Sequence, residues 1–163
     1  MHERVVLALP FTLLRDVRID VSLPAVKRQA IAELGYGTNA KLMVGFSERI
    51  WREPRGAGGR EPGSNGSVLT DLPFQLTWET TRMQAGKAGI LTCFTGGQRG
   101  VELGQGTPAA QSERFARELE RIFPGAAEWR IREARFHWRS FEFSKGSYAS
   151  YRVGQWTTIG GAE

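Results

Sequence analysis

Lys41 is the residue of this 163-residue chain whose type and position point most directly to chemistry. It lies inside an apolar stretch, residues 38–47, in which alternate side chains fall on opposite faces of a strand. One such face carries Leu42, Val44 and Phe46, and Lys41 falls on the other with Met43 and Gly45. A lysine at this position is either solvated on an edge strand or directed into a cavity, where loss of water makes its amine a proton relay. The pattern leaves both alternatives open.

The other nucleophiles and metal ligands offer less. Cys93 lies within an apolar strand pattern, so we expect a buried and inert thiol rather than a partner for His137. No GxSxG motif accompanies a Ser-His-Asp relay. Glu118 and Glu120 are typical of a solvated helix face. One cysteine and two distant histidines argue against a zinc site, and we expect no metal.

Aromatic side chains concentrate between residues 136 and 156. This density indicates either a packed core or the wall of a flat apolar pocket, where aromatic faces guide an amine or an aromatic ligand. Composition alone does not decide between them. The aromatic residues of this stretch are Phe136, Trp138, Phe141, Phe143, Tyr148, Tyr151 and Trp156.

Charge and hydropathy disfavour two classes of partner. The net charge is +5, but the arginines are scattered among glutamates and form no block, so we expect no nucleic-acid binding. No apolar run approaches the roughly 18 residues that a membrane span needs. The first ten residues lack the basic-then-apolar layout of a signal peptide. We therefore expect a cytoplasmic protein.

The expected elements are strands interleaved with two helices, which favours an α+β fold with a mixed sheet flanked by helices. Ser22 and Pro24 predict a helix start, as do Thr107 and Pro108. A long exposed loop is expected over 52–67. Its residues 56–59, GAGG, have no strand before them and no helix after them, so they are no dinucleotide fingerprint. Strands are expected at 4–9, 17–21, 38–47, 67–70, 75–80, 89–95 and 128–138, and helices at 24–34 and from 107 to the Pro124-Gly125 stop.

Taken together, four ordered stretches resemble the flavin-containing amine oxidases, the family of monoamine, polyamine and L-amino-acid oxidases. They cover nearly the whole chain, and their order and spacing agree with the family. The stretches are RVVLALPFTLLRDVRID (4–20), LPAVKRQAIAELGYGTNAKLMVGFSERIW (23–51), GSVLTDLPFQLTWE (66–79) and FHWRSFEFSKGSYASYRVGQW (136–156).

The resemblance implies roles for four residues. Lys41 matches the lysine that approaches the flavin N5 through a water, and Trp138 matches the tryptophan beside the flavin ring. Tyr148 matches one wall of the aromatic cage that orients the substrate amine. Ser147 stands where some members carry the cysteine joined to flavin, and because serine forms no thioether, the resemblance implies non-covalent FAD. The resemblance also implies a reaction in which an amine and dioxygen are the substrates, and an imine and hydrogen peroxide are the products.

The departures from the family pattern set the expected organisation. The GxGxxG motif and the acidic ribose ligand are missing, as is the segment that closes over the FAD. We therefore expect residues 1–135 to be the substrate-binding domain, entered by a strand of the FAD domain at 4–9, and residues 136–163 to begin the return to that domain. The chain alone is expected to bind FAD weakly or not at all, and to need the remainder of the FAD-binding domain as its partner. The alternative is a non-catalytic module that binds a ligand or a partner.

Overall fold

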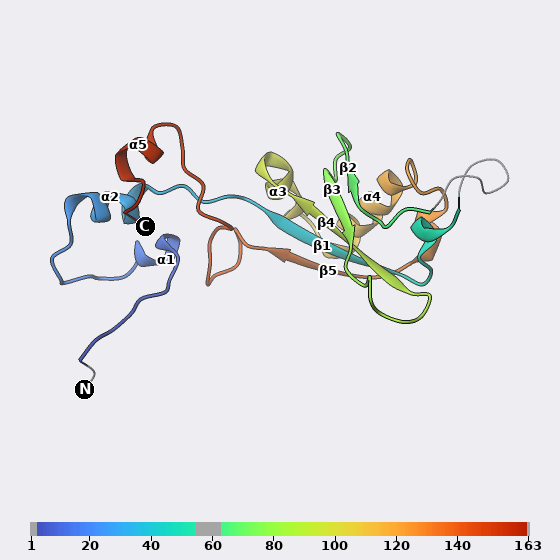
Figure 1. Cartoon of the computed structure of the whole chain (residues 1–163), viewed down its shortest axis with the longest axis horizontal. Helices are drawn as coiled ribbons and strands as arrows, with labels where there is room; N and C mark the ends of the chain where they lie inside the picture. The colour runs from blue at the N-terminus through green and yellow to red at the C-terminus, as the bar shows by residue number, and fades with distance from the viewer. Residues whose placement is uncertain (1–2, 55–62, 163) are drawn as a thin grey trace. The chain divides into compact units, whose positions relative to one another are not determined.

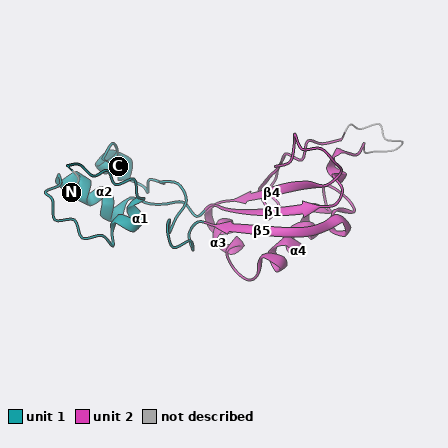
Figure 2. Ribbon diagram, turned by 90° about the horizontal axis from the view of Figure 1, so that it is seen from below, with its two compact units in different colours: residues 1–38, 138–163 teal, residues 39–137 magenta. Residues whose placement is uncertain are grey.

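A computed structural model describes residues 3–54 and 63–162 (Figure 1). The GAGG segment, half of the expected 52–67 loop and His2 lie outside the described residues. The chain divides into two compact units, residues 1–38 with 138–163 (unit 1) and residues 39–137 (unit 2), coloured separately in Figure 2. The N-terminal 38 residues thus belong in space with the C-terminal tail.

Unit 2 contains a five-stranded sheet in the order β2-β3-β4-β1-β5. The expected α+β class is confirmed, and the sheet that was expected to be mixed is antiparallel at each of its four described pairings. Five of the seven expected strands are present, and their bounds agree with the predicted ones to within two residues. They are β1 (Ala40–Phe46), β2 (Val68–Leu69), β3 (Leu76–Glu79), β4 (Gly89–Thr95) and β5 (Arg130–His137).

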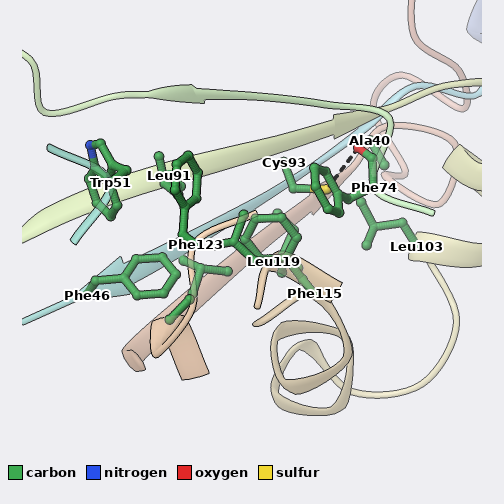
Figure 3. Close-up of a cluster of buried hydrophobic side chains, with 13 residues drawn as sticks. Ala40, Phe46, Trp51, Phe74, Leu91, Cys93, Leu103, Phe115, Leu119 and Phe123 are labelled. Atoms are coloured by element: carbon green, nitrogen blue, oxygen red, sulfur yellow. Dashed lines mark hydrogen bonds between the residues drawn. The ribbon is translucent and has the colours of Figure 1, made fainter. Parts of the chain in front are cut away.

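The central strand β1 alternates as its sequence predicts. Leu42, Val44 and Phe46 are fully buried, whereas Lys41 and Met43 on the other side are half-buried. The buried side chains pack with those of β4, of the segment before β3 and of the helices (Figure 3). Removing this apolar surface from water supplies most of the driving force that holds the sheet and helices of unit 2 together.

Two helices pack on one face of the sheet, α3 (Gly97–Leu103) and α4 (Pro108–Leu119). The predicted start of α4 is confirmed, since the Thr107 side chain accepts a hydrogen bond from the Ala110 N–H at 3.1 Å. Phe115 and Leu119 carry its buried stripe into the core. The regular helix ends at Leu119, before the Pro124-Gly125 stop, and a short 3₁₀ turn, η2 (Ala126–Trp129), leads into β5.

Unit 1 is built from three short helices around a small core. They are α1 (Phe11–Leu14), α2 (Ala25–Glu33) and α5 (Gln155–Ile159). The predicted helix at 24–34 corresponds to α2. The core cluster consists of Phe11, Leu14, Ala30, Leu34 and Ile159. Among the residues that the structure describes, no helix is long and apolar enough to cross a membrane.

The strands predicted at 4–9 and 17–21 are wrong, because both segments lie outside the described helices and strands and pair with no strand in the described part of the chain. Val5 and Val6 are 75% and 89% exposed. An apolar run rich in β-branched residues indicates a preference for extended backbone, but a β-strand forms only where a second strand is available to pair with it. Helices α3 and α5 were not predicted, since each is too short to show an apolar period.

A buried carboxylate ties the β3–β4 end of unit 2 together. Glu79 is 2% exposed and accepts hydrogen bonds from Trp51 at 2.8 Å and from Arg52 at 2.9 and 2.7 Å. Arg49, also buried, lies 3.1 Å from the same carboxylate and donates to the backbone carbonyls of Thr81, Gln84 and Gly86. Glu79 thereby joins η1 (Ile50–Arg52) to β3 and to the β3–β4 turn.

We predict that Glu79→Gln destabilises the chain by about 3 kcal/mol, because it leaves the buried Arg49 guanidinium without its counter-charge. The measurement is urea unfolding at pH 7 followed by circular dichroism. Glu113→Gln is the matched control, since Glu113 pairs with Arg117 on an exposed helix face and its loss should cost less than about 0.5 kcal/mol. Equal effects of the two substitutions would contradict this account of Glu79.

Lowering the pH should reveal the same contribution of Glu79 to the stability of the chain. Burial raises the pKa of Glu79, but the hydrogen bonds from Trp51 and Arg52 outweigh it and hold that pKa below its ordinary value of 4.5. A depressed carboxylate pKa contributes stability above pH 4.5 that is lost as the pH falls through the folded-state value. The wild-type chain should therefore lose more stability than Glu79→Gln when both are unfolded below pH 4.5.

Candidate active site

Lys41 lies near the start of β1, on the sheet face opposite α3 and α4, which we call the open face. Its Nζ is 5.6 Å from the centre of the Trp78 ring and 5.9 Å from that of Phe94. These are cation–π distances, and the two rings shield the ammonium group from part of its water. The open face is made by Lys41, Met43 and Gly45 of β1, Leu76 and Trp78 of β3, Ile90, Thr92 and Phe94 of β4, and Arg132, Ala134 and Phe136 of β5.

Strand pairing explains this environment. Lys41 lies directly opposite Phe94 on one neighbouring strand and Phe136 on the other. Because β1 is an interior strand, Lys41 is not a lysine on a sheet edge. Trp78 and Phe94 were not predicted as neighbours of Lys41. The two-residue period of β3 and β4 puts each ring on a definite face of its strand, but this face can be matched to that of Lys41 only once the strand register is known.

Ser147 and Tyr148 are held in unit 1 by a short antiparallel pairing with the segment after α2. The Ser147 N–H donates to the Gly37 carbonyl at 2.9 Å, and the Gly37 N–H donates to the Tyr148 carbonyl at 2.8 Å. A bridge between Tyr36 and Ala149 continues the pairing. The Tyr148 side chain is 65% exposed, so the loop presents this ring to its surroundings.

Two glycines permit this close approach. A Cβ at Gly35 would stand 2.2 Å from the Ser150 carbonyl oxygen, and one at Gly146 would stand 2.7 Å from Cβ of Tyr36. Both contacts are shorter than side-chain carbons tolerate. The small residues at 35 and 146 are therefore what allows residues 147–150 to lie against residues 35–37.

Trp138 follows β5 directly and is half-buried. Its carbonyl accepts hydrogen bonds from the Ser144 hydroxyl at 2.8 Å and the Phe141 N–H at 3.3 Å, which close a turn. Trp138, Ser147 and Tyr148 thus belong to unit 1, whereas Lys41 belongs to unit 2. Along the chain, Trp138 comes two residues after Phe136, which lies opposite Lys41 in the β1–β5 pairing.

Cys93 lies on the opposite face of the sheet, as part of the buried core. Its thiol donates to the Phe74 carbonyl at 3.6 Å (Figure 3), and burial raises its pKa to about 12. The predicted buried thiol is confirmed. A cavity of ≈ 40 Å³ beside it is lined in part by Thr95, Arg114 and Phe115. Within the described residues, no group of three or more His, Cys, Asp or Glu side chains could hold a metal ion.

The family model for flavin containing amine oxidoreductases matches residues 2–161. The chain belongs to this family. Two curated relatives are each 25% identical to it. One is YobN of Bacillus subtilis (strain 168), a candidate L-amino-acid oxidase by name, over 92% of the chain and 31% of its own length. The other is Polyamine oxidase 3 of Oryza sativa subsp. japonica, over 94% and 30%.

Solved structures show the same fold. Cyclohexylamine oxidase from Brevibacterium oxydans IH-35A superposes with a TM-score of 0.77 at 18% identity, over 95% of this chain and 33% of that one. Putrescine oxidase bound to putrescine gives 0.75 at 22% identity, over 94% and 32%. The chain therefore spans about a third of the length of the proteins that it matches.

Each unit by itself carries side chains that suit a planar aromatic ring system. In unit 1 these are the exposed Tyr148 ring and the half-buried Trp138, and in unit 2 the rings beside Lys41. The dinucleotide end needs a glycine-rich turn between a strand and a helix of a parallel βαβ unit. In the described residues β4, Gly96-Gly97 and α3 follow one another, but β4 pairs antiparallel with both of its neighbours, so this succession is not such a unit.

Cys93 should be chemically silent in the folded chain. With a pKa of about 12 almost no thiolate exists at pH 8, and the side chain is 2% exposed. We expect a disulfide reagent such as dithionitrobenzoate to react at least about 100-fold more slowly with the native chain than with the chain in 6 M urea. Rapid labelling of the native protein would show that the thiol is accessible.

Proposed function

We propose that this chain is the substrate-binding part of an FAD-dependent amine oxidase, and that it supplies the protein wall against which an amine meets the flavin. The enzyme converts a primary or secondary amine, or an amino acid, to an imine. The amine gives up two electrons and two protons, which dioxygen receives to become hydrogen peroxide. FAD, when bound, supplies this redox chemistry. The family match over nearly the whole chain supports the proposal.

The observation that carries the proposal is the position of Lys41. The stability of the sheet alone gives no reason for a lysine beside Trp78 and Phe94 on an interior strand, since an apolar residue would pack there without losing hydration. A site that must hold or move a proton beside an apolar substrate gives such a reason. We assign Lys41 the role of positioning a proton or a water at the reacting centre.

The resemblance to the family assigns roles to three further residues. Tyr148 would orient the substrate amine with its exposed ring face, and Trp138 would lie beside the flavin ring. Ser147 leaves the cofactor non-covalently bound, because its hydroxyl cannot replace a cysteine thioether. Residues 1–135 act in this proposal as the substrate-binding domain, and residues 136–163 begin the return to the FAD domain.

The remainder of the FAD-binding domain is the proposed partner of this chain. The segment 4–9 supports this assignment, because Val5, Val6 and Leu7 are each more than half exposed and the extended backbone has unused hydrogen-bonding groups. An exposed apolar segment of this kind is suited to completing a sheet in another part of the protein. The expected strand at 4–9 would then form only in the assembled enzyme.

The first test is cofactor retention. We predict that the 163-residue chain purified with excess FAD retains less than about a tenth of an equivalent after desalting, because its described residues contain no parallel βαβ unit that would hold the pyrophosphate. Co-expression with the FAD-binding polypeptide should restore an equivalent of flavin, and acid precipitation should release all of it into the supernatant. Stoichiometric retention by the chain alone, or flavin that stays in the precipitate, would contradict the respective part of the proposal.

The second test is Lys41→Met in the flavin-loaded assembly. We expect the rate of amine-dependent flavin bleaching under anaerobic conditions to fall by about 100-fold, because the substitution keeps the apolar stem but removes the proton-holding group. Lys87→Met is the control, since Lys87 is an exposed lysine of unit 2 that lies 3.6 Å from Glu48. An unchanged rate in Lys41→Met at full flavin content would remove Lys41 from the mechanism.

A further inference from the structure

One buried glutamine of unit 1 joins the end of α2 to the segment that carries Tyr148. Gln155, the first residue of α5, is 8% exposed, and α5 packs on α2 (Figure 1). Its Oε1 accepts hydrogen bonds from the N–H groups of Gly35 at 3.1 Å and Arg152 at 2.8 Å, and its Nε2 donates to the Glu33 carbonyl at 2.6 Å. The proposed function gives no role to this side chain.

The way in which α2 ends explains why the glutamine is needed. In a continued α-helix the Glu33 carbonyl would accept a hydrogen bond from the N–H of residue 37, four positions further on. The Gly37 N–H donates instead to the Tyr148 carbonyl at 2.8 Å, so α2 gives up a bond of its own to hold the Tyr148 segment. Gln155 supplies the donor that the Glu33 carbonyl loses, which avoids leaving a partly buried carbonyl without a partner.

The same amide continues the pairing between residues 35–37 and 147–150. The Ser150 N–H donates to the Gly35 carbonyl at 2.8 Å, whereas the Gly35 N–H donates to Gln155 Oε1. The glutamine side chain, with one acceptor and a donor group, therefore takes the place of a backbone peptide group beside Gly35. Since the same Oε1 also accepts from the Arg152 N–H, the Tyr148 segment is held against the end of α2 on both sides of its ring.

Burial separates Gln155 from the other side chain that donates to the end of α2. Arg15 donates to the carbonyls of Ile31 and Leu34 at 2.8 and 2.6 Å, but it is exposed, so water can take its place when it is removed. Water has little access to Gln155, so its partners would lose their hydrogen bonds together without replacement. The arrangement of the Tyr148 segment therefore depends more on the glutamine than on the arginine.

Resting on the proposed function, we propose that Gln155 is a positioning residue of the oxidase, which acts through residues 147–150 to fix the direction in which the Tyr148 ring meets the substrate amine. Because that ring is 65% exposed, its backbone rather than the packing of its side chain must set this direction. Gln155 takes no part in the redox step and acts on the amine only through Tyr148.

The test is a double-mutant cycle in the flavin-loaded assembly of this chain with the FAD-binding polypeptide. Benzylamine, putrescine and L-leucine are the probes, and the one that bleaches the wild-type flavin fastest under anaerobic conditions is used, with rates taken per bound flavin. Gln155→Met keeps the length of the side chain but removes its hydrogen bonds. We expect it to raise the half-saturating probe concentration by about 10-fold, but by less than about 2-fold in the Tyr148→Leu background, as for residues that act through each other.

A second measurement needs no flavin. In the 163-residue chain, Gln155→Met should make the amide hydrogens of Gly37, Ser147 and Ser150 exchange at least about 10-fold faster, because the pairing that protects them opens more often. The amides within α2 and β1 should keep their wild-type rates, which shows that both units remain folded.

Gln29→Met is the matched control. Gln29 lies on the exposed side of the same helix and donates to the Glu33 carboxylate at 3.1 Å, so it makes no contact with the Tyr148 segment. We expect this substitution to change neither the half-saturating probe concentration nor the exchange rates of the paired amides.

An equal effect of Gln155→Met with and without the Tyr148 ring would overturn the inference, as would wild-type exchange at Ser147 or faster exchange throughout α2. These outcomes are separate from a failure of the proposed function. An assembly that bleaches in a Lys41-dependent way but is indifferent to Gln155→Met keeps the oxidase and rejects the positioning role. An assembly whose flavin no amine probe bleaches rejects the oxidase, whatever the exchange rates show.

Discussion

The two-residue period of β1 is the constraint on which the rest of unit 2 depends. Leu42, Val44 and Phe46 must enter the core together, so Lys41 and Met43 must face the other way. A shift of one residue in either flanking pairing would set Lys41 against Leu119 and Phe115 and would expose three apolar side chains. The strand is hydrogen-bonded on both sides, so its register fixes which residues of β4 and β5 stand beside Lys41.

The two faces of the sheet carry different kinds of side chain. The helix-covered face holds the apolar core, the inert Cys93 and the Glu79 cluster, and its charges are matched by partners within the chain. The open face holds aromatic rings together with Lys41 and Arg132. Stability is therefore concentrated on one side, which leaves the other side free to carry residues that a folded core alone does not need.

Local signals in the sequence predicted local features well. The alternation of β1, the Thr107–Pro108 start of α4 and the burial of Cys93 each depend on a few adjacent residues, and each is present in the structure. The rings beside Lys41 escaped prediction because Trp78 and Phe94 reach it only through strand pairing. The pairing of residues 35–37 with 147–150 spans more than a hundred residues of chain, and no short window contains both partners.

The segment 4–9 also shows that a local sequence pattern does not determine strand pairing. Its composition predicts a strand, yet the described chain provides no strand to pair with it.

Unit 1 as a whole has a small core and a large exposed apolar surface. Its described core cluster contains five buried residues, whereas most of the large apolar side chains that the structure leaves exposed belong to it, Trp156 and Phe143 among them. A small core beside a large apolar surface is a poor basis for independent stability and a good basis for association. Unit 2, with its larger core and its satisfied buried charges, has the features of a domain that folds by itself. Under the proposed function, the exposed apolar side chains of unit 1, the part of the chain that carries Trp138, Ser147 and Tyr148, are those that the remainder of the FAD-binding domain would cover.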